Sequence, residues 1–209
     1  MKTKITLMLL TLIAMSFSMI GCNDTCTKEQ EKDETNGTIE TIMARRSIRK
    51  YQAEPVKRET MDVILKCGIN APNGMNKQSW EIRVLDNPET ISKLKALMVA
   101  ANPEMNPEMV AGCFRNAPTL VLVANDSAYD FSPIDCGLLA ENIMLSAWSL
   151  GVGSVCLASP IRFISNSPEA MEMLGFSEGY TPIICVGLGY ADEAPEAKPR
   201  DITKVKYLD

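Results

Sequence analysis

Apolar residues recur every three or four positions in several stretches of the chain, which predicts amphipathic helices. These helical stretches are 38–45, 55–70, 88–98, 135–150 and 169–174. Shorter runs either alternate between apolar and polar residues or are apolar throughout, which predicts strands with one or both faces buried. The strands are expected at 80–85, 118–124, 152–157 and 182–188. The mixture predicts an α+β fold, a small sheet with helices packed on it.

The ends of these elements carry their own signals. Thr38 and Asp135 are side chains of the kind that cap helix N-termini, and Gly151 is expected to stop the helix that begins at Asp135. Residues 102–109 repeat Asn-Pro-Glu-Met in tandem, which predicts a mobile loop or a broken helix near an opening. From Ala191 onwards the sequence shows neither the helical nor the strand periodicity of apolar residues, so an extended C-terminal arm is expected.

The N-terminus has the pattern of a secretory signal. Two lysines precede an almost unbroken apolar run, Ile5–Ile20, which is shorter than the ~20 residues that a membrane-spanning helix needs. The Met-Ile-Gly-Cys sequence that follows resembles a bacterial lipobox, with Met19 where leucine is usual. We therefore expect removal of residues 1–21 and lipidation of Cys22. The protein would then be an exported, membrane-anchored lipoprotein that faces the periplasm or the exterior.

The next segment, residues 22–37, mixes acids with lysines, threonines and an Asn-Gly pair, and has almost no apolar residue. Such a segment cannot bury enough apolar surface to order itself, so it is expected to be an acidic flexible tether. The folded domain would occupy residues 38–209, and its contact with the membrane would come only through the N-terminal lipid.

Composition excludes several function classes. The 209 residues carry a net charge of −5, and the one dense basic run is five residues long, so no nucleic-acid partner is expected. The chain has no histidine, which excludes Ser-His and Cys-His nucleophile systems. Single cysteines in the folded part lack metal-ligand spacing, so we expect small buried hydrophobic residues and no metal site. These cysteines are Cys67, Cys113, Cys136, Cys156 and Cys185.

Three arginines and a hydroxyl fall within five residues at Arg45-Arg46-Ser47-Ile48-Arg49. Holding these cations together favours an anion among them. A phosphate monoester, with about −1.5 to −2 charges and three acceptor oxygens, suits the cluster well. The alternative is a solvated basic end of a helix, where cations are also favoured.

Two further clusters would suit a planar ligand. Asn76 and Gln78 place two amides, which donate and accept together, in a turn before the strand at 80–85. Gly151-Val152-Gly153-Ser154 follows a helix end, where glycine lets the backbone approach a ligand closely. The alternatives are a turn that satisfies its own backbone and a simple helix C-cap.

In this order, the clusters resemble the nitroreductase family of FMN-dependent oxidoreductases, and the resemblance covers nearly everything from Thr38 onwards. It is carried by Arg-Arg-Ser-Ile-Arg at 45–49, Ala-Pro-x-x-x-Asn-Lys-Gln-x-Trp at 71–80, Asp-Cys at 135–136, Ala-Glu-Asn-Ile-Met-Leu at 140–145, the glycines at 151–154, Gly-Leu-Gly-Tyr at 187–190 and Lys-Pro-Arg at 198–200. The family implies a mainly antiparallel central sheet flanked by helices, with an extended C-terminal arm.

The resemblance implies an FMN site at a homodimer interface, built from both chains. The phosphate would be held by Arg45, Arg46 and Ser47 together with Arg200 from the arm. Arg49 would lie towards the flavin pyrimidine, where positive charge favours the reduced anionic cofactor and raises its reduction potential.

Carried over in the same way, Asn76 and Gln78 would bond the ring edge or the ribityl chain. Backbone N–H groups of Gly153 and Ser154 would face the ring near its reactive nitrogen. No protein acid or base is required, so no catalytic side chain is expected, because the flavin carries the chemistry.

Two positions depart from the family pattern. Ser79 stands where proline usually precedes the tryptophan, which would alter the turn and leave the chemistry unchanged. Ala147-Trp148 occupies the helix in which family members often have a histidine. We expect the Trp148 side chain to pack in the core or at the dimer contact rather than to line the substrate pocket.

The implied activity is a ping-pong cycle in which NAD(P)H reduces FMN and leaves, and a nitro compound, quinone or similar small acceptor then enters the same place. Two alternatives stay open: a flavin-binding carrier or sensor lipoprotein without nicotinamide-dependent turnover, and a surface interaction module that has lost the cofactor. Export adds a constraint, because reduced nicotinamide is a cytosolic metabolite. We therefore expect another electron donor, or oxidation of an extracytoplasmic substrate.

Overall fold

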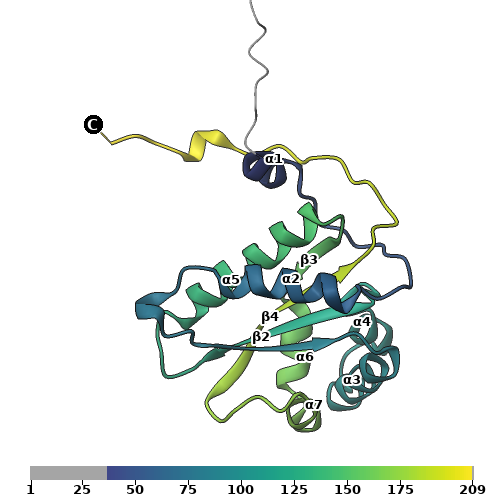
Figure 1. Cartoon of the computed structure of the whole chain (residues 1–209). Helices are drawn as coiled ribbons and strands as arrows, with labels where there is room; N and C mark the ends of the chain where they lie inside the picture. The colour runs from purple at the N-terminus through teal and green to yellow at the C-terminus, as the bar shows by residue number, and fades with distance from the viewer. Residues whose placement is uncertain (1–36, 209) are drawn as a thin grey trace, which may run out of the picture. The chain divides into compact units, whose positions relative to one another are not determined.

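The computed structural model describes residues 37–208, which form helices on both faces of a four-stranded sheet (Figure 1). The helices are α1 (Gly37–Ala44), α2 (Arg58–Ile69), α3 (Pro88–Ala101), α4 (Pro107–Ala111), α5 (Ser132–Ser149), α6 (Ser159–Ser165) and α7 (Pro168–Leu174). The strands are β1 (Trp80–Leu85), β2 (Thr119–Asp126), β3 (Gly153–Leu157) and β4 (Tyr180–Gly189). Short 3₁₀ turns are η1 (Gly74–Asn76), η2 (Gly112–Phe114) and η3 (Ile202–Lys204). The predicted α+β class is confirmed.

Strand β2 lies inside the sheet, whose order is β1-β2-β4-β3 with every pair antiparallel. Val84 of β1 lies opposite Val121 of β2. Leu120 and Leu122 face one layer of helices, whereas Val121 and Val123 face the other. Burial on both faces explains why β2 reads as a continuous apolar run rather than an alternating one.

Helices cover both faces of the sheet (Figure 1), and each face has its own hydrophobic core. On one face α2 and α5 pack together through side chains such as Ile64 and Ile143, which have no exposed surface. On the other face α3, α4, α6 and α7 surround Leu94 and Phe114, which are equally buried. Burial of each such side chain contributes about 1.5–3 kcal/mol. These buried contacts hold α5 firmly against the sheet and α2.

Two helices begin at Asn-Pro-Glu sequences. The Asn87 side chain accepts the N–H groups of the second and third residues of α3 at 2.8 and 3.0 Å, and Asn106 does the same for α4 at 2.8 and 3.1 Å. Proline follows each cap, where its missing N–H costs nothing. Asn102 instead is buried and donates to two backbone carbonyls at 2.8 and 3.2 Å. For residues 102–109 a mobile loop or a broken helix was predicted. The structure has the broken helix, because α3 ends at Ala101 and α4 begins at Pro107.

The predicted start of α2 was wrong. The helix begins at Arg58 rather than Pro55. Val56 is buried, and its N–H donates to Thr119 Oγ1 on β2 at 3.0 Å. This bond to the sheet holds the chain ahead of α2 away from helical geometry.

The predicted N-caps Asp135 and Thr38 were also wrong. Helix α5 begins at Ser132, so Asp135 lies inside its first turn, and Thr38 lies inside α1. Gly151 follows α5 with a φ of +74°, as expected for a helix stop. Helix α6 has no counterpart among the predicted elements.

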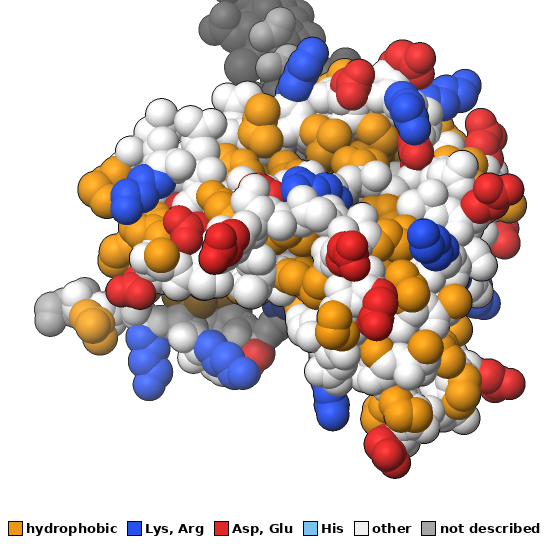
Figure 2. All heavy atoms as spheres, turned by 90° about the horizontal axis from the view of Figure 1, so that it is seen from below, with side chains coloured by type: hydrophobic (Ala, Val, Ile, Leu, Met, Phe, Trp, Pro, Cys, Tyr) orange, Lys and Arg blue, Asp and Glu red, His pale blue; other side chains and the backbone are white. Residues whose placement is uncertain are grey.

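Helix α1 and the C-terminal arm expose apolar side chains. No residue of α1 is buried, and Ile39, Ile42 and Met43 are 51–71% exposed. From residue 192 to 208 the arm has no regular element except η3, and it exposes Ile202, Val205, Tyr207 and Leu208. Figure 2 shows further hydrophobic side chains exposed between acidic and basic ones on the face seen from below.

The prediction that the five cysteines are buried is confirmed in part. Cys113, Cys136 and Cys185 are buried, and burial raises the pKa of the first two thiols to about 11. Cys67 is half-buried. Cys156 is exposed, so a buried role is wrong for it, because it alternates with inward-facing neighbours on the edge strand β3. All five thiols are free.

The predicted signal peptide (1–21), the lipidated Cys22 and all of the tether except Gly37 lie outside the described residues. Within residues 37–208, no helix combines the length and the apolar character needed to cross a membrane.

Candidate functional site

Five basic side chains and one carboxylate surround a cavity of about 230 Å³ between the segment after α1 and the C-terminal arm. The cavity is lined by Arg45, Arg46, Ser47, Arg49, Pro195, Glu196, Lys198 and Arg200. All the residues predicted to hold a phosphate, and Arg49, thus lie at one place. Their role in binding stays a prediction.

The 45–49 segment is held by the start of β3. Ile48 is buried, and its N–H donates to Ser154 O at 2.9 Å, so that Ser47 and Ser154 form a parallel bridge. A Cβ on Gly153 would lie 2.8 Å from Ile48 Cγ1, so glycine is required here for two segments to pack closely. The Tyr51 hydroxyl donates to Ile48 O at 2.5 Å. These contacts fix the backbone from which the arginines project.

The arm returns along the same segment. Asp192 N–H donates to Lys50 O at 3.0 Å, and the Glu193 carboxylate accepts the N–H groups of Arg49 and of Lys50, the latter at 3.1 Å. Burial raises the pKa of the nearby Tyr51 hydroxyl, and the Glu193 charge raises it further. The arm is therefore anchored before it passes over the arginines.

The cations of the cavity are poorly neutralised by the protein. Arg45 Nε lies 4.0 Å from Glu141 Oε1 on α5, a distance at which a half-exposed pair is weak. Arg46 donates to two backbone carbonyls, both at 2.8 Å. Arg49 and Arg200 each donate to one backbone carbonyl, at 3.2 and 3.0 Å. Because carbonyls carry no net charge, the cavity keeps an excess of positive charge that suits a phosphate.

A buried hydroxyl beside this segment lacks a partner. Ser154 Oγ is fully buried and makes no hydrogen bond with any residue that the structure describes. An unpaired buried hydroxyl costs about 1–3 kcal/mol. The groups that line the cavity, namely the guanidinium groups, the Lys198 ammonium and the Ser47 hydroxyl, form a donor set that fits the phosphate of FMN.

The predicted amide residues lie in a turn with an unusual backbone. Met75, Asn76 and Gln78 have φ values of 53°, 54° and 50°, a region that non-glycine residues rarely adopt. Asn73 Oδ1 accepts the Gln78 N–H at 2.9 Å, so Asn73 satisfies part of the turn. The side-chain amides of Asn76 and Gln78 are exposed and make no hydrogen bond within residues 37–208. They are available to a ligand.

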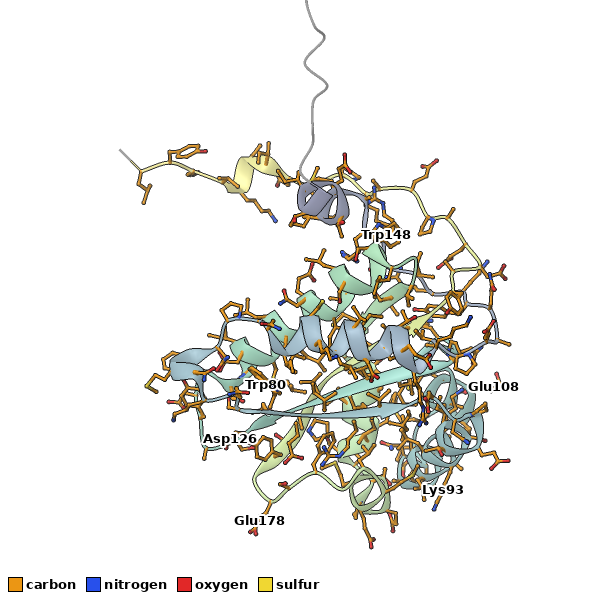
Figure 3. All side chains as sticks on the ribbon, in the orientation of Figure 1. Trp80, Lys93, Glu108, Asp126, Trp148 and Glu178 are labelled. Carbon is orange, nitrogen blue, oxygen red and sulfur yellow. The ribbon has the colours of Figure 1, made fainter. Side chains whose placement is uncertain are left out.

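The amide turn and the basic cavity lie near opposite ends of α5. The turn is bonded to Asp135 at the start of α5, whereas Ser47 is bridged to Ser154 beyond its end. With 18 residues, α5 is about 27 Å long. Figure 3 shows Trp80, just after the turn, far from Trp148 near the other end of α5. The turn and the cavity therefore contact different parts of α5, with Arg45 beside Glu141 in the middle of that helix.

Trp148 is not a core residue. It is half-buried and lines a cavity of about 180 Å³ together with Gly151, Val152, Gly153 and Ala191. The expected dimer contact stays a prediction for Trp148.

Reasoning from sequence missed three residues of the site region. Lys198 lines the cavity, and its signal was present in the Lys-Pro-Arg tail, where only Arg200 was assigned. Glu193 anchors the arm, and Asp135 bonds the amide turn. The sequence around each acid does not show these hydrogen bonds, because the residues that they bond are remote in sequence.

The sequence of this chain is similar to those of known proteins. The model of a family described as "Nitroreductase family" matches residues 42–190. The NADPH-flavin oxidoreductase of Vibrio harveyi is 31% identical over 172 residues, which cover 79% of this chain and 70% of that protein.

Solved structures are similar as well. A nitroreductase with bound FMN from Bacteroides fragilis has a TM-score of 0.75 and 27% identity, covering 84% of this chain and 100% of that one. One from Desulfitobacterium hafniense, also with bound FMN, has a TM-score of 0.74 and 30% identity, with coverage of 83% and 99%.

Proposed function

The chain belongs to the nitroreductase family and is an FMN-dependent oxidoreductase, and we propose that it works by a ping-pong cycle. NAD(P)H or another donor supplies a hydride, and nitro compounds, quinones or similar small molecules accept it. When bound, FMN supplies the hydride-transfer chemistry, while the protein supplies position and electrostatics.

The observation that carries this proposal is the basic cavity. Arg45, Arg46 and Arg200 line it together with Ser47, and the one ion pair of these arginines within residues 37–208 is the 4.0 Å contact of Arg45 with Glu141. Lys198 also lines it, so the arm contributes two of the five positive charges of the cavity. Together these groups hold the cofactor by its phosphate and leave the ring free to meet donor and acceptor in turn.

The remaining predicted residues act on the ring. Arg49 lines the same cavity, and the proposal is that its positive charge lies towards the ring and so favours the reduced cofactor. Asn76 and Gln78 offer amide donors and acceptors to the ring edge or ribityl chain. For Gly153 and Ser154 the proposal is that their backbone N–H groups face the ring near its reactive nitrogen.

We propose a homodimer with the cofactor between the chains. Two observations support it: the amide turn and the basic cavity contact different parts of α5, and α1 and the arm expose apolar side chains that a second copy would cover. The test is the mass of the purified protein in solution by light scattering. A monomer that still binds FMN would contradict the dimeric site.

We also propose that the protein is an exported lipoprotein, on the strength of the sequence alone: cleavage after residue 21, lipid on Cys22 and a tether to residue 37. Its electron donor would then be a reductant other than cytosolic NAD(P)H. Cell fractionation tests this, with Cys22→Ser as the control that should leave the membrane fraction. Processed wild-type protein in the cytosol would contradict export.

The first experiment is an absorbance spectrum of the purified protein before and after reduced nicotinamide is added without oxygen. A flavin spectrum that bleaches supports a nicotinamide-dependent reductase. One that persists with every donor points to a carrier or sensor. The absence of a flavin spectrum, even after FMN is added, would refute the proposed function.

A further inference from the structure

The carboxylate of Asp135 plays no part in the phosphate cavity, yet it is only 3% exposed. Its two oxygens lie 3.1 and 3.3 Å from the Gly74 N–H, and the Ser79 hydroxyl donates to Oδ2 at 3.3 Å. No basic side chain pairs with it among residues 37–208. The acceptor atoms of this buried acid are thus directed to the two ends of the amide turn.

The start of α5 and the loop before it hold the turn at further points. Ser132 Oγ donates to Ser79 O at 2.5 Å. A Cβ on Gly74 would lie 2.1 Å from the Tyr129 hydroxyl, so the turn packs directly on that ring. Lys77 Nζ lies over the same ring, 4.1 Å from its centre. The turn is therefore fixed from several sides.

This support matters because the turn does not adopt its conformation freely. Its three non-glycine residues with positive φ are individually unfavourable and persist only where surrounding contacts impose them. Two of the three, Asn76 and Gln78, carry the exposed amides. The direction of these amides therefore depends on the contacts at Gly74 and Ser79, of which Asp135 provides one at each end.

We propose that Asp135 is a positioning residue for the flavin ring, with Ser79 as its partner. Through Gly74 and Ser79 it holds the turn so that Asn76 and Gln78 face the ring or ribityl chain. This inference rests on the proposed function, since it takes FMN to be the ligand. Ser79, the residue that departs from the family pattern, supplies in this chain a hydroxyl contact that a proline would lack.

The test compares Asp135→Asn and Ser79→Ala with two matched controls on the opposite face of the sheet. Asn102→Ala removes a buried side chain with three hydrogen bonds, and Ser167→Ala removes a buried hydroxyl that accepts the Ala170 N–H at 3.2 Å. Amide hydrogen exchange at residues 74–78 is measured in the flavin-free protein. Dissociation constants are measured for FMN and for riboflavin, which lacks the phosphate.

In Asp135→Asn, exchange at the turn should become about tenfold faster, because a charge-assisted bond is replaced by a neutral one of roughly half its strength. FMN and riboflavin should both bind about tenfold more weakly, by the same factor, since the phosphate cavity is unchanged. Ser79→Ala should show the same pattern to a smaller degree. The controls should lower stability and leave turn exchange and both affinities unchanged.

Other outcomes overturn the inference in distinguishable ways. If the wild type binds FMN and Asp135→Asn binds both flavins as tightly as the wild type does, the positioning role is wrong and the proposed function stands. If only FMN is weakened, Asp135 acts on the phosphate end and the inference is also wrong. If the wild type binds neither flavin, the proposed function fails, and the inference fails with it.

Discussion

Removal of Arg45 and Arg200 tests the charge argument most directly. The two residues come from opposite ends of the folded part and meet at one cavity. Arg45 has one weak ion pair at 4.0 Å, and Arg200 donates only to the nearby Lys198 O at 3.0 Å. Neither packs in a core, so the double variant Arg45→Ala with Arg200→Ala should fold normally.

The expected loss of affinity is large. A hydrogen bond to a charged group contributes about 1.5–3 kcal/mol, so two lost guanidinium contacts amount to about 3–6 kcal/mol. That corresponds to FMN binding weakened by about 10²–10⁴-fold. Lys198 and Arg46 remain in the cavity, and the lower end of this range is therefore expected.

The assay is the flavin-to-protein ratio after gel filtration, followed by titration of the flavin-free protein with FMN. The matched control is Arg58→Ala with Arg162→Ala, which removes the same charge from exposed positions outside the cavity. Thermal unfolding checks that both double variants fold. Flavin retention in Arg45→Ala with Arg200→Ala equal to that of the control would refute the phosphate assignment.

Three further predictions concern the contacts that hold the site. Gly153→Ala should lower the free energy of unfolding by about 1–3 kcal/mol, because its Cβ would lie 2.8 Å from Ile48 Cγ1. Urea unfolding measures this loss, with Gly137→Ala as the control because a Cβ at Gly137 would meet open space. Equal stabilities of the two variants would contradict the prediction. Burial raises the pKa of Tyr51, so the unfolded chain loses the phenol proton first and stability should fall as pH rises above 10.0. Tyr51→Phe should show a smaller fall between pH 9 and pH 11 (about one unit either side of the ordinary value), and equal slopes would show that Tyr51 is not responsible. Glu193→Gln should weaken the bonds to the 49–50 backbone and make the C-terminal arm more sensitive to limited proteolysis; an unchanged cleavage rate would count against its anchoring role.

Local signals predicted much of the fold. Strand β1 has the predicted bounds, because its alternating pattern is bordered by a turn and an Asn-Pro helix start. The start of α3 at Pro88 and the stop at Gly151 follow from caps and backbone preferences that act within a few residues. The start of α2 was missed because the Val56 N–H is bonded to Thr119, far along the chain, which keeps the residues before Arg58 out of the helix.

The same division applies to the candidate site. The sequence by itself determined the fold class, the cluster at 45–49 and the amides in the turn, because these depend on residue type and on neighbours within about ten positions. Only the tertiary structure decided that Lys198 and Arg200 face that cluster, that Glu193 anchors the arm and that Asp135 bonds the amide turn. The physical reason is that these contacts join segments that are remote in sequence. The order of the strands and the packing of α5 bring such segments together, and no local pattern records which partner a buried or exposed charge will meet.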